Sequence, residues 1–501
     1  MSARRVTGLF QGLTHSLSLC VLAAPAWAQG PADAAARALV EQRRAEERLQ
    51  QQRDALTPHT VPPGIREAMP PPLHWPERES PCFVIREIAL TGEGSHRFGF
   101  AIEDLVAGDD RATGRCLGAR GIGVVAERAQ RALLARGLVT SRVLVPPQQL
   151  DAGRLELALL PGRVRTVRFA EGTDLRATAR NALPVNAGDI LDLRDIEQGL
   201  ENFRRLPSVA ADIVIEPAQE PGQSDLLIAW RQPNPWRVQL ALDDSGTRGT
   251  GRYQGRVTVH YDHWWTLNDL LYVSLSHDLG GGEPGQRGTS SETVHYSLPW
   301  GHWVLGLTAS SSRYHQNVAG PYEVFRYSGL SDDAELSLSR LLRRDARSKT
   351  SLSLKAWARR SRNHIDDTEL EPQRRATGGW ELGITHHQAF AAATLDVQLT
   401  HRRGTGAFHA LPAPEEDFGE GTSRMRVSRL DLQLKGRRSP TPTPRSTRAS
   451  WCASNPAETP RWPARWCVRT GCRRTWAVIC ASRACRTGLA TRSAAARRAA
   501  A

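Results

Sequence analysis

Apolar and polar residues alternate through a long stretch of the chain, from Trp236 to Lys435. The first segment sets Trp236, Val238, Leu240 and Leu242 against Arg237, Gln239, Ala241 and Asp243. A period of two predicts a β-strand with two unlike faces. About ten such segments follow one another, separated by turn residues and without a helical pattern. The stretch is therefore predicted to form one antiparallel sheet.

This alternation fits two kinds of protein. In a soluble sandwich the polar face meets water and the apolar face packs on a second sheet. In an outer-membrane β-barrel the apolar face meets lipid and the polar face lines a wet lumen. The alternation does not choose between them, so the flanking chain must decide.

Two consecutive segments upstream show the same predicted element order, β-α-α-β-β. In the first, residues 82–161, the elements are Phe83–Leu90, Phe98–Val106, Ile122–Ala135, Leu138–Val145 and Leu155–Leu160. In the second, residues 162–234, they are Val164–Phe169, Leu175–Ala182, a helix from Leu193 to Leu206 that Asp192 caps, Ala210–Ile215 and Leu226–Trp230. A repeated order predicts a tandem pair of small α+β domains.

The N-terminus reads as an export signal. Arg4 and Arg5 precede an apolar run, and Ala26-Trp27-Ala28 provides a small-residue cleavage site, so residues 1–28 are expected to leave between Ala28 and Gln29. Residues 29–57 predict a helix that is polar nearly all round, which a hydrophobic core does not accommodate. The proline-rich residues 58–81 predict an extended linker.

Charge and cysteine are unevenly distributed. Residues 437–501 contain 14 Arg, no Lys and one acid, so they carry +13 of the formal net charge of +14. The rest of the chain is nearly neutral, which argues against a nucleic-acid partner. Of the eight cysteines, one lies in the signal peptide and five lie in this tail. Cys82 and Cys116 remain as a pair in the exported body, where a disulfide is expected.

No motif predicts an enzyme, a cofactor or a metal site. Asp244-Ser245-Gly246 has turn chemistry and no placed histidine. Gly280-Gly281-Gly282 is not followed by the Lys-Ser/Thr of a phosphate loop. His260 and His263 are three apart on a predicted strand, so they point to opposite faces and do not share a metal ion.

The whole order resembles the outer-membrane transporters of two-partner secretion, the haemolysin-activator type with POTRA domains and a β-barrel. Five short motifs carry the resemblance. They are the first strand with Cys82 and Cys116, Leu160-Pro161-Gly162-Arg163-Val164 at the domain join, Asp244-Ser245-Gly246, Leu267-Asn268-Asp269 and Tyr296-Ser297-Leu298-Pro299-Trp300-Gly301. It covers about residues 29–436 and implies α+β periplasmic domains, a transmembrane barrel at 235–436 and a plug helix at 29–57.

The resemblance also implies a role: capture and export of a large secreted client across the outer membrane. The further partners it implies are outer-membrane lipid, periplasmic chaperones and the barrel-assembly machinery. A client strand is expected to add to an exposed sheet edge of a POTRA domain. The candidate edge residues are Leu138, Val143, Val145, Leu155, Leu157, Ile213 and Ile215.

The family pattern stops after Lys435. Residues 437–501 show no strand or helix periodicity and are expected to be a disordered, aberrant tail, as from a gene read in a shifted frame. A barrel of about ten strands is expected to leave unpaired edges in lipid and to be impaired as a pore. Two alternative functions remain: a barrel-assembly factor of the same superfamily, and a periplasmic binding or scaffold module.

Overall fold

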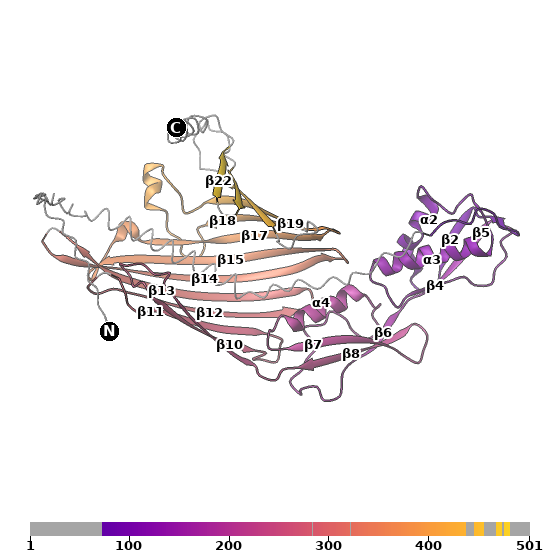
Figure 1. Cartoon of the computed structure of the whole chain (residues 1–501), viewed down its shortest axis with the longest axis horizontal. Helices are drawn as coiled ribbons and strands as arrows, with labels where there is room; N and C mark the ends of the chain where they lie inside the picture. Colours follow the sequence, from indigo (N-terminus) through magenta and orange to yellow (C-terminus); the bar gives the residue numbers. More distant parts are fainter. Residues whose placement is uncertain are drawn as a thin grey trace, which may run out of the picture.

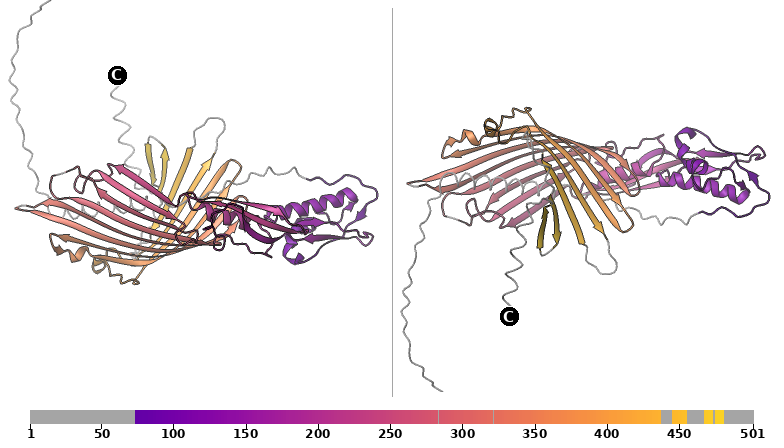
Figure 2. Two further views of the ribbon diagram at one scale, coloured as in Figure 1. Left: turned by 90° about the horizontal axis from the view of Figure 1, so that it is seen from below. Right: turned by 90° about the horizontal axis from the view of Figure 1, so that it is seen from above.

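The computed structural model describes residues 73–282, 284–320, 322–436, 445–454, 467–472 and 475–480, the last three as backbone. The expected signal peptide, the helix expected within 29–57 and most of the 58–81 linker lie outside the described residues. An α+β arm leads into a long, curved antiparallel sheet (Figure 1). The curvature of the sheet is clearest in Figure 2.

The first unit of the arm packs helices on a three-stranded sheet. Its sheet has the order β2-β5-β4, in which β2 and β5 are parallel. The unit contains β2 (Glu87–Thr91), η1 (Ser95–Ala101), α2 (Glu103–Ala107), α3 (Ala119–Ala135), β4 (Arg142–Leu144) and β5 (Arg154–Leu160). Val125, Ala129 and Leu133 of α3 are fully buried, as the helical spacing predicts. The prediction of a β-α-α-β-β order holds here.

The disulfide between Cys82 and Cys116 is present. Cys116 lies in the short strand β3 (Cys116–Leu117), which pairs with β1 (Phe83–Val84) directly after Cys82. The bond therefore closes a small ribbon beside the N-terminus of α3. Glu79 accepts hydrogen bonds from the N–H groups of Gly118, Arg120 and Gly121 and so caps that helix.

The second unit has the sheet order β6-β8-β7, again with one parallel pair. Its elements are β6 (Arg163–Phe169), α4 (Leu193–Arg204), β7 (Ala210–Pro217) and β8 (Gln223–Arg231). Asp192 caps α4 through the N–H of Arg194, as predicted. Arg165 and Thr166 of β6 both donate to Asp225 of β8, and hydrogen bonds from Arg165 hold the pKa of Asp225 at about 2.

The helix expected at Leu175–Ala182 is absent, so the second unit departs from the predicted order. The segment consists of turns and extended chain. Apart from local turn bonds such as Ala182 N–H to the Ala179 carbonyl, its polar groups bond to the large sheet: Asn181 donates to Pro299, and Thr178 accepts from Asn268. Tertiary partners thus replace the intrahelical hydrogen bonds, which a segment this short forms poorly.

The large sheet has 12 strands in the order β20-β19-β18-β17-β15-β14-β13-β12-β11-β10-β9, with β16 paired to β15. Apart from β20 the strands are β9 (Trp236–Asp243), β10 (Gln254–Asp262), β11 (Leu270–Asp278), β12 (Gly288–Trp300), β13 (Trp303–Ala319), β14 (Val324–Arg344), β15 (Ser348–Ile365), β16 (Thr368–Glu369), β17 (Arg375–Ala389), β18 (Ala393–Thr405) and β19 (Arg426–Gly436). Short turns η2 (Glu371–Gln373) and η3 (Pro414–Phe418) lie in its loops. Among the described residues no helix is long and apolar enough to cross a membrane.

The expectation of no regular structure after residue 436 is wrong for part of the tail. Strand β20 (Arg445–Ser454) pairs antiparallel with β19, so it extends the sheet by one strand. Strands β21 (Cys467–Cys472) and β22 (Thr475–Cys480) pair with each other. An exposed sheet edge offers hydrogen-bonding groups to any extended chain, so β20 needs no sequence periodicity to pair there.

Candidate functional site

One face of the large sheet is apolar over nearly its whole width. The pairing register places aliphatic residues opposite one another from strand to strand: Leu240 with Val257, Val257 with Leu275, Leu305 with Leu338, Leu338 with Leu354, Leu354 with Leu382, and Ile384 with Leu399. These side chains remain exposed; Leu240, for example, is 76% exposed. A monomeric soluble protein rarely exposes so large an apolar patch. This face, called the apolar face below, requires an apolar surrounding.

The opposite face, the polar face, carries hydroxyl and charged groups. Hydroxyls pair across strands, Thr258 with Ser274 at 2.9 Å and Ser276 with Ser291 at 2.7 Å. Many of these side chains are buried within the curve of the sheet: Thr258, Ser274, Thr293, Ser310, Ser331 and Ser361. Hydroxyl groups form hydrogen bonds with each other or with water and form none with lipid tails, so this face suits the water-filled interior of a barrel.

Charged groups gather on the polar face of the middle strands. Lys355 of β15 lies 3.5 Å from Glu335 of β14 and 3.8 Å from Glu381 of β17. On the same face Arg402 stacks over the ring of Trp357, with its guanidinium carbon 3.9 Å from the ring centre. Both signs of charge are present, so this wall favours neither an acidic nor a basic polypeptide.

Aromatic residues mark the ends of the strands nearest the arm. Trp236 contacts Tyr261 edge to face at 4.5 Å between ring centres, and Tyr261 contacts Trp264 at 5.1 Å. Trp300 pairs with Trp303 at the turn between β12 and β13. Aromatic residues at strand ends are typical of the interface between a bilayer and water.

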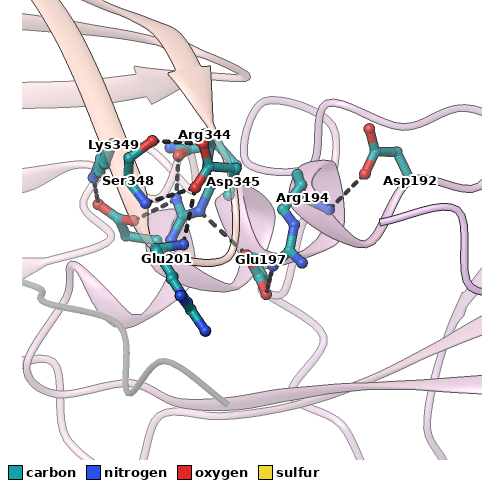
Figure 3. Close-up of polar contacts among 10 residues, drawn as sticks. Asp192, Arg194, Glu197, Glu201, Arg344, Asp345, Ser348 and Lys349 are labelled. Carbon is teal, nitrogen blue, oxygen red and sulfur yellow. Dashed lines mark hydrogen bonds and ion pairs between the residues drawn. The ribbon is translucent and has the colours of Figure 1, made fainter. Parts of the chain in front are cut away.

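Helix α4 is held against the turn between β14 and β15 by ion pairs (Figure 3). Arg344 donates to Glu201 at 2.7 Å and to Gln198 at 2.8 Å, and it lies 3.4 Å from Glu197. Lys349 also pairs with Glu201. Burial acts to raise the pKa of Glu201, but Lys349 and Arg344 outweigh it, so that the pKa is lowered. The carboxylate stays ionised in a pocket that excludes most water.

A second set of contacts ties the arm to the sheet through buried amides. Asn268 in the turn between β10 and β11 donates to Thr178 and to Asn181. Asn202 of α4 donates to the carbonyls of Ala182 and Gly301 at 2.7 and 2.8 Å. All three asparagines are at most 2% exposed. We call this set, together with the ion pairs of α4, the joint.

The sequence did not predict the joint. Leu267-Asn268-Asp269 contributed only to the family resemblance, and the sequence pattern indicated the ion pairs of α4 only weakly. Glu197 and Glu201 are four apart and therefore share one face of α4, a pattern that usually means a solvated helix surface. Only the tertiary contact with Arg344 gives that face a partner.

The prediction that Leu155 and Leu157 lie on an exposed sheet edge is wrong. Leu155 and Leu157 lie in β5, which is the central strand of its sheet, and both are fully buried. They are therefore not available to a client strand. Leu138 precedes β4 and packs on the core of the first unit. Val143, Val145, Ile213 and Ile215 lie on or beside β4 and β7, which stand at the ends of their sheet orders.

Comparison with known proteins agrees with this architecture. Residues 83–162 match a POTRA domain of ShlB type, residues 163–217 match a POTRA domain, and residues 222–442 match the haemolysin secretion/activation protein ShlB/FhaC/HecB. An outer membrane transporter, CdiB-2 of Burkholderia pseudomallei, is 34% identical over 80% of this chain and 70% of its own length. The chain belongs to the ShlB/FhaC/HecB family.

Two further relatives are less similar in sequence. The hemolysin transporter protein ShlB of Serratia marcescens is 26% identical over 58% of this chain and 51% of its own length. The solved structure of CdiB from Acinetobacter baumannii superposes with a TM-score of 0.71 at 28% identity, covering 88% of this chain and 82% of that one. Family membership makes the large sheet a wall of an outer-membrane β-barrel and the two α+β units periplasmic POTRA domains. The ends of the strands that carry the joint thus face the periplasm.

Proposed function

We propose that this chain captures a large secreted client in the periplasm and passes it across the outer membrane in two-partner secretion, and that its export step is impaired because β9 and β20 end the described sheet without pairing to each other. The observation that carries the proposal is the division of one sheet into an apolar and a polar face, joined to two POTRA domains. Outer-membrane lipid is the partner of the apolar face. The client is the partner of the polar face and of the POTRA edges. Periplasmic chaperones and the barrel-assembly machinery are the partners during insertion.

Capture would take place at strands β4 and β7. Each stands at the end of its sheet order and carries an exposed apolar side chain, Leu144 at 52% and Val214 at 48% exposure. An extended client strand that pairs there gains main-chain hydrogen bonds, and its alternate side chains contact these residues. Val143 of the first domain and Ile213 and Ile215 of the second pack on the domain cores behind these edges, and Val145 is exposed beside Leu144.

The joint would hold these edges in place during capture. Asn202 and Glu201 both belong to α4, which packs on β7 within the second domain and bonds to the barrel at its periplasmic end. A strand captured at β7 is therefore held near the entrance to the polar face. The mixed charges of Lys355, Glu335 and Glu381 let the client slide past without a single strong binding site.

Charges placed on the edges test the capture step. Leu144→Lys and Val214→Lys should each weaken pull-down of the secreted client, because a lysine on an edge strand discourages strand addition. Leu134→Lys is the matched control, since Leu134 is an exposed leucine of the same domain that lies on α3. Unchanged capture by both edge variants would refute strand addition at β4 and β7. Equal loss in all three variants would show a non-specific effect of charge.

A further inference from the structure

The segment that departs from the predicted helix carries a fully exposed leucine at the periplasmic end of the barrel. Leu175 is 103% exposed, the highest value among the exposed large apolar residues of the described chain. It lies on the turn that follows β6 in the second POTRA domain. Neither the POTRA core nor the joint covers this side chain, so the exposure of a large apolar residue at this position is unexplained by either.

The next residue fixes this leucine beside the barrel. Arg176 donates to the carbonyl of His263 at 2.5 Å, and its own carbonyl lies 2.7 Å from Nε2 of that histidine. His263 is fully buried against Trp230, with ring centres 5.1 Å apart. Two hydrogen bonds to one buried residue hold the turn of Leu175 firmly against the turn between β10 and β11.

That barrel turn exposes two tryptophans. Trp264 is 45% and Trp265 is 65% exposed, and they directly follow His263. Trp264 contacts Tyr261, which pairs with Trp236 on the apolar face. The aromatic surface thus continues without interruption from the lipid-facing wall to the turn that binds Arg176. Arg180, which is exposed farther along the same POTRA segment, adds a positive charge.

We infer that Leu175, Trp264 and Trp265 form a membrane contact through which the second POTRA domain rests on the periplasmic leaflet of the outer membrane. Exposed tryptophans beside a lipid-facing wall are placed at the depth of the headgroups, where an aliphatic side chain next to them reaches the acyl boundary. Phospholipid is the partner that this surface fits, because the surface continues the apolar face. The contact rests on the proposed function, since it requires the sheet to stand in a bilayer.

Photo-crosslinking to lipid tests the contact. A diazirine-bearing aliphatic residue replaces Leu175 in the full chain, which is then reconstituted in vesicles of phosphatidylethanolamine and phosphatidylglycerol. The same residue at Leu240, on the apolar face, is the positive control, and at Leu144, an exposed leucine of the first POTRA domain, the negative control. All three side chains are exposed, so the replacements leave the core intact.

The expected result is lipid labelling at position 175 that approaches that at 240 and exceeds that at 144 several-fold. If position 240 is labelled but 175 is labelled no more than 144, the membrane contact is refuted while the proposed function stands. Crosslinking from position 175 to the polypeptide instead of lipid also overturns the contact. If position 240 is not labelled, the assignment of the apolar face to lipid is refuted, and the membrane contact at Leu175 is refuted with it.

Discussion

Arg344 and Glu201 form an ion pair at 2.7 Å although 143 residues separate them in the chain. Arg344 ends β14 in the barrel and Glu201 lies in α4 of the second POTRA domain. Their side chains are only 5% and 13% exposed. The periplasmic arm and the membrane wall are therefore joined by a largely desolvated charge pair as well as by a covalent connection.

Removing one partner of this pair should loosen the joint. Arg344→Ala removes one of the cations that neutralise Glu201 in a site that excludes most water, and a broken buried pair typically costs about 3–5 kcal/mol. Hydrogen–deuterium exchange of the α4 amides should then rise by roughly 100-fold or more, since each ~1.4 kcal/mol is a factor of ten. Arg343→Ala is the control, because Arg343 is a neighbouring cation whose side chain is 76% exposed. Equal exchange in the two variants would contradict a structural role for Arg344.

The joint should also weaken in acid. The pKa of Glu201 is lower in the docked protein than its ordinary value of 4.5, because Lys349 and Arg344 together outweigh the effect of burial. A group with a depressed pKa stabilises the docked state above its ordinary pKa and loses that contribution as the pH falls through the docked value. Exchange of α4 should therefore be constant from pH 7 to about 5, after correction for intrinsic rates, and rise below about 4.5.

The variant Glu201→Gln isolates this carboxylate from the other acids. It should show faster α4 exchange than the wild type at pH 7, because the amide removes the negative charge beside Lys349 and leaves Arg344 with Glu197 at 3.4 Å. Between pH 5 and 4 its exchange should change less than that of the wild type. An identical acid response in both proteins would mean that another group controls the joint.

The disulfide should stabilise the first POTRA domain. Cys82 and Cys116 are 34 residues apart, and closing a loop of that length is worth roughly 3–4 kcal/mol on the chain-entropy model. The double variant Cys82→Ser with Cys116→Ser should unfold this domain at lower urea, measured by exchange of the buried α3 amides, while α4 is unaffected. Cys452→Ser is the control, since that cysteine lies in the tail. A shared shift of α3 and α4 would instead indicate that the two domains unfold as one unit.

The two faces of the barrel wall should respond differently to the same charge. Leu354→Arg puts a cation on the apolar face, where an arginine near the bilayer centre costs about 2–4 kcal/mol. Ser353→Arg puts it on the polar face of the same strand, next in sequence to Leu354. The fraction of protein inserted into vesicles, separated by flotation, should fall for Leu354→Arg and remain close to wild type for Ser353→Arg. The opposite ranking would mean that the lipid and the lumen have been assigned to the wrong faces.

Local rules predicted much of this fold. The period of two from Trp236 to Lys435 determines which side chains share a face, because a strand alternates them without reference to its neighbours. The buried stripe of α3 follows from a spacing of four residues, and the cap of α4 from an aspartate placed before an amphipathic run. The choice of a membrane barrel over a sandwich came from the order of segments around the sheet and from the family resemblance.

Long-range partners decided the rest. Residues 175–182 have helix-forming side chains, yet Thr178 and Asn181 bond to the barrel, and the segment takes the shape of its partner instead of a helix. The central place of β5 depends on a parallel pairing with β2, whose residues lie 67 positions earlier (Glu87 pairs with Arg154), and a local pattern does not encode such a pairing. Glu201 and Arg344 look like ordinary surface charges until the fold brings them together and removes water from between them. The sequence alone thus determined the strands, helices and faces, while only the tertiary structure decided how the arm is joined to the wall, because that joint depends on contacts between residues far apart in the chain.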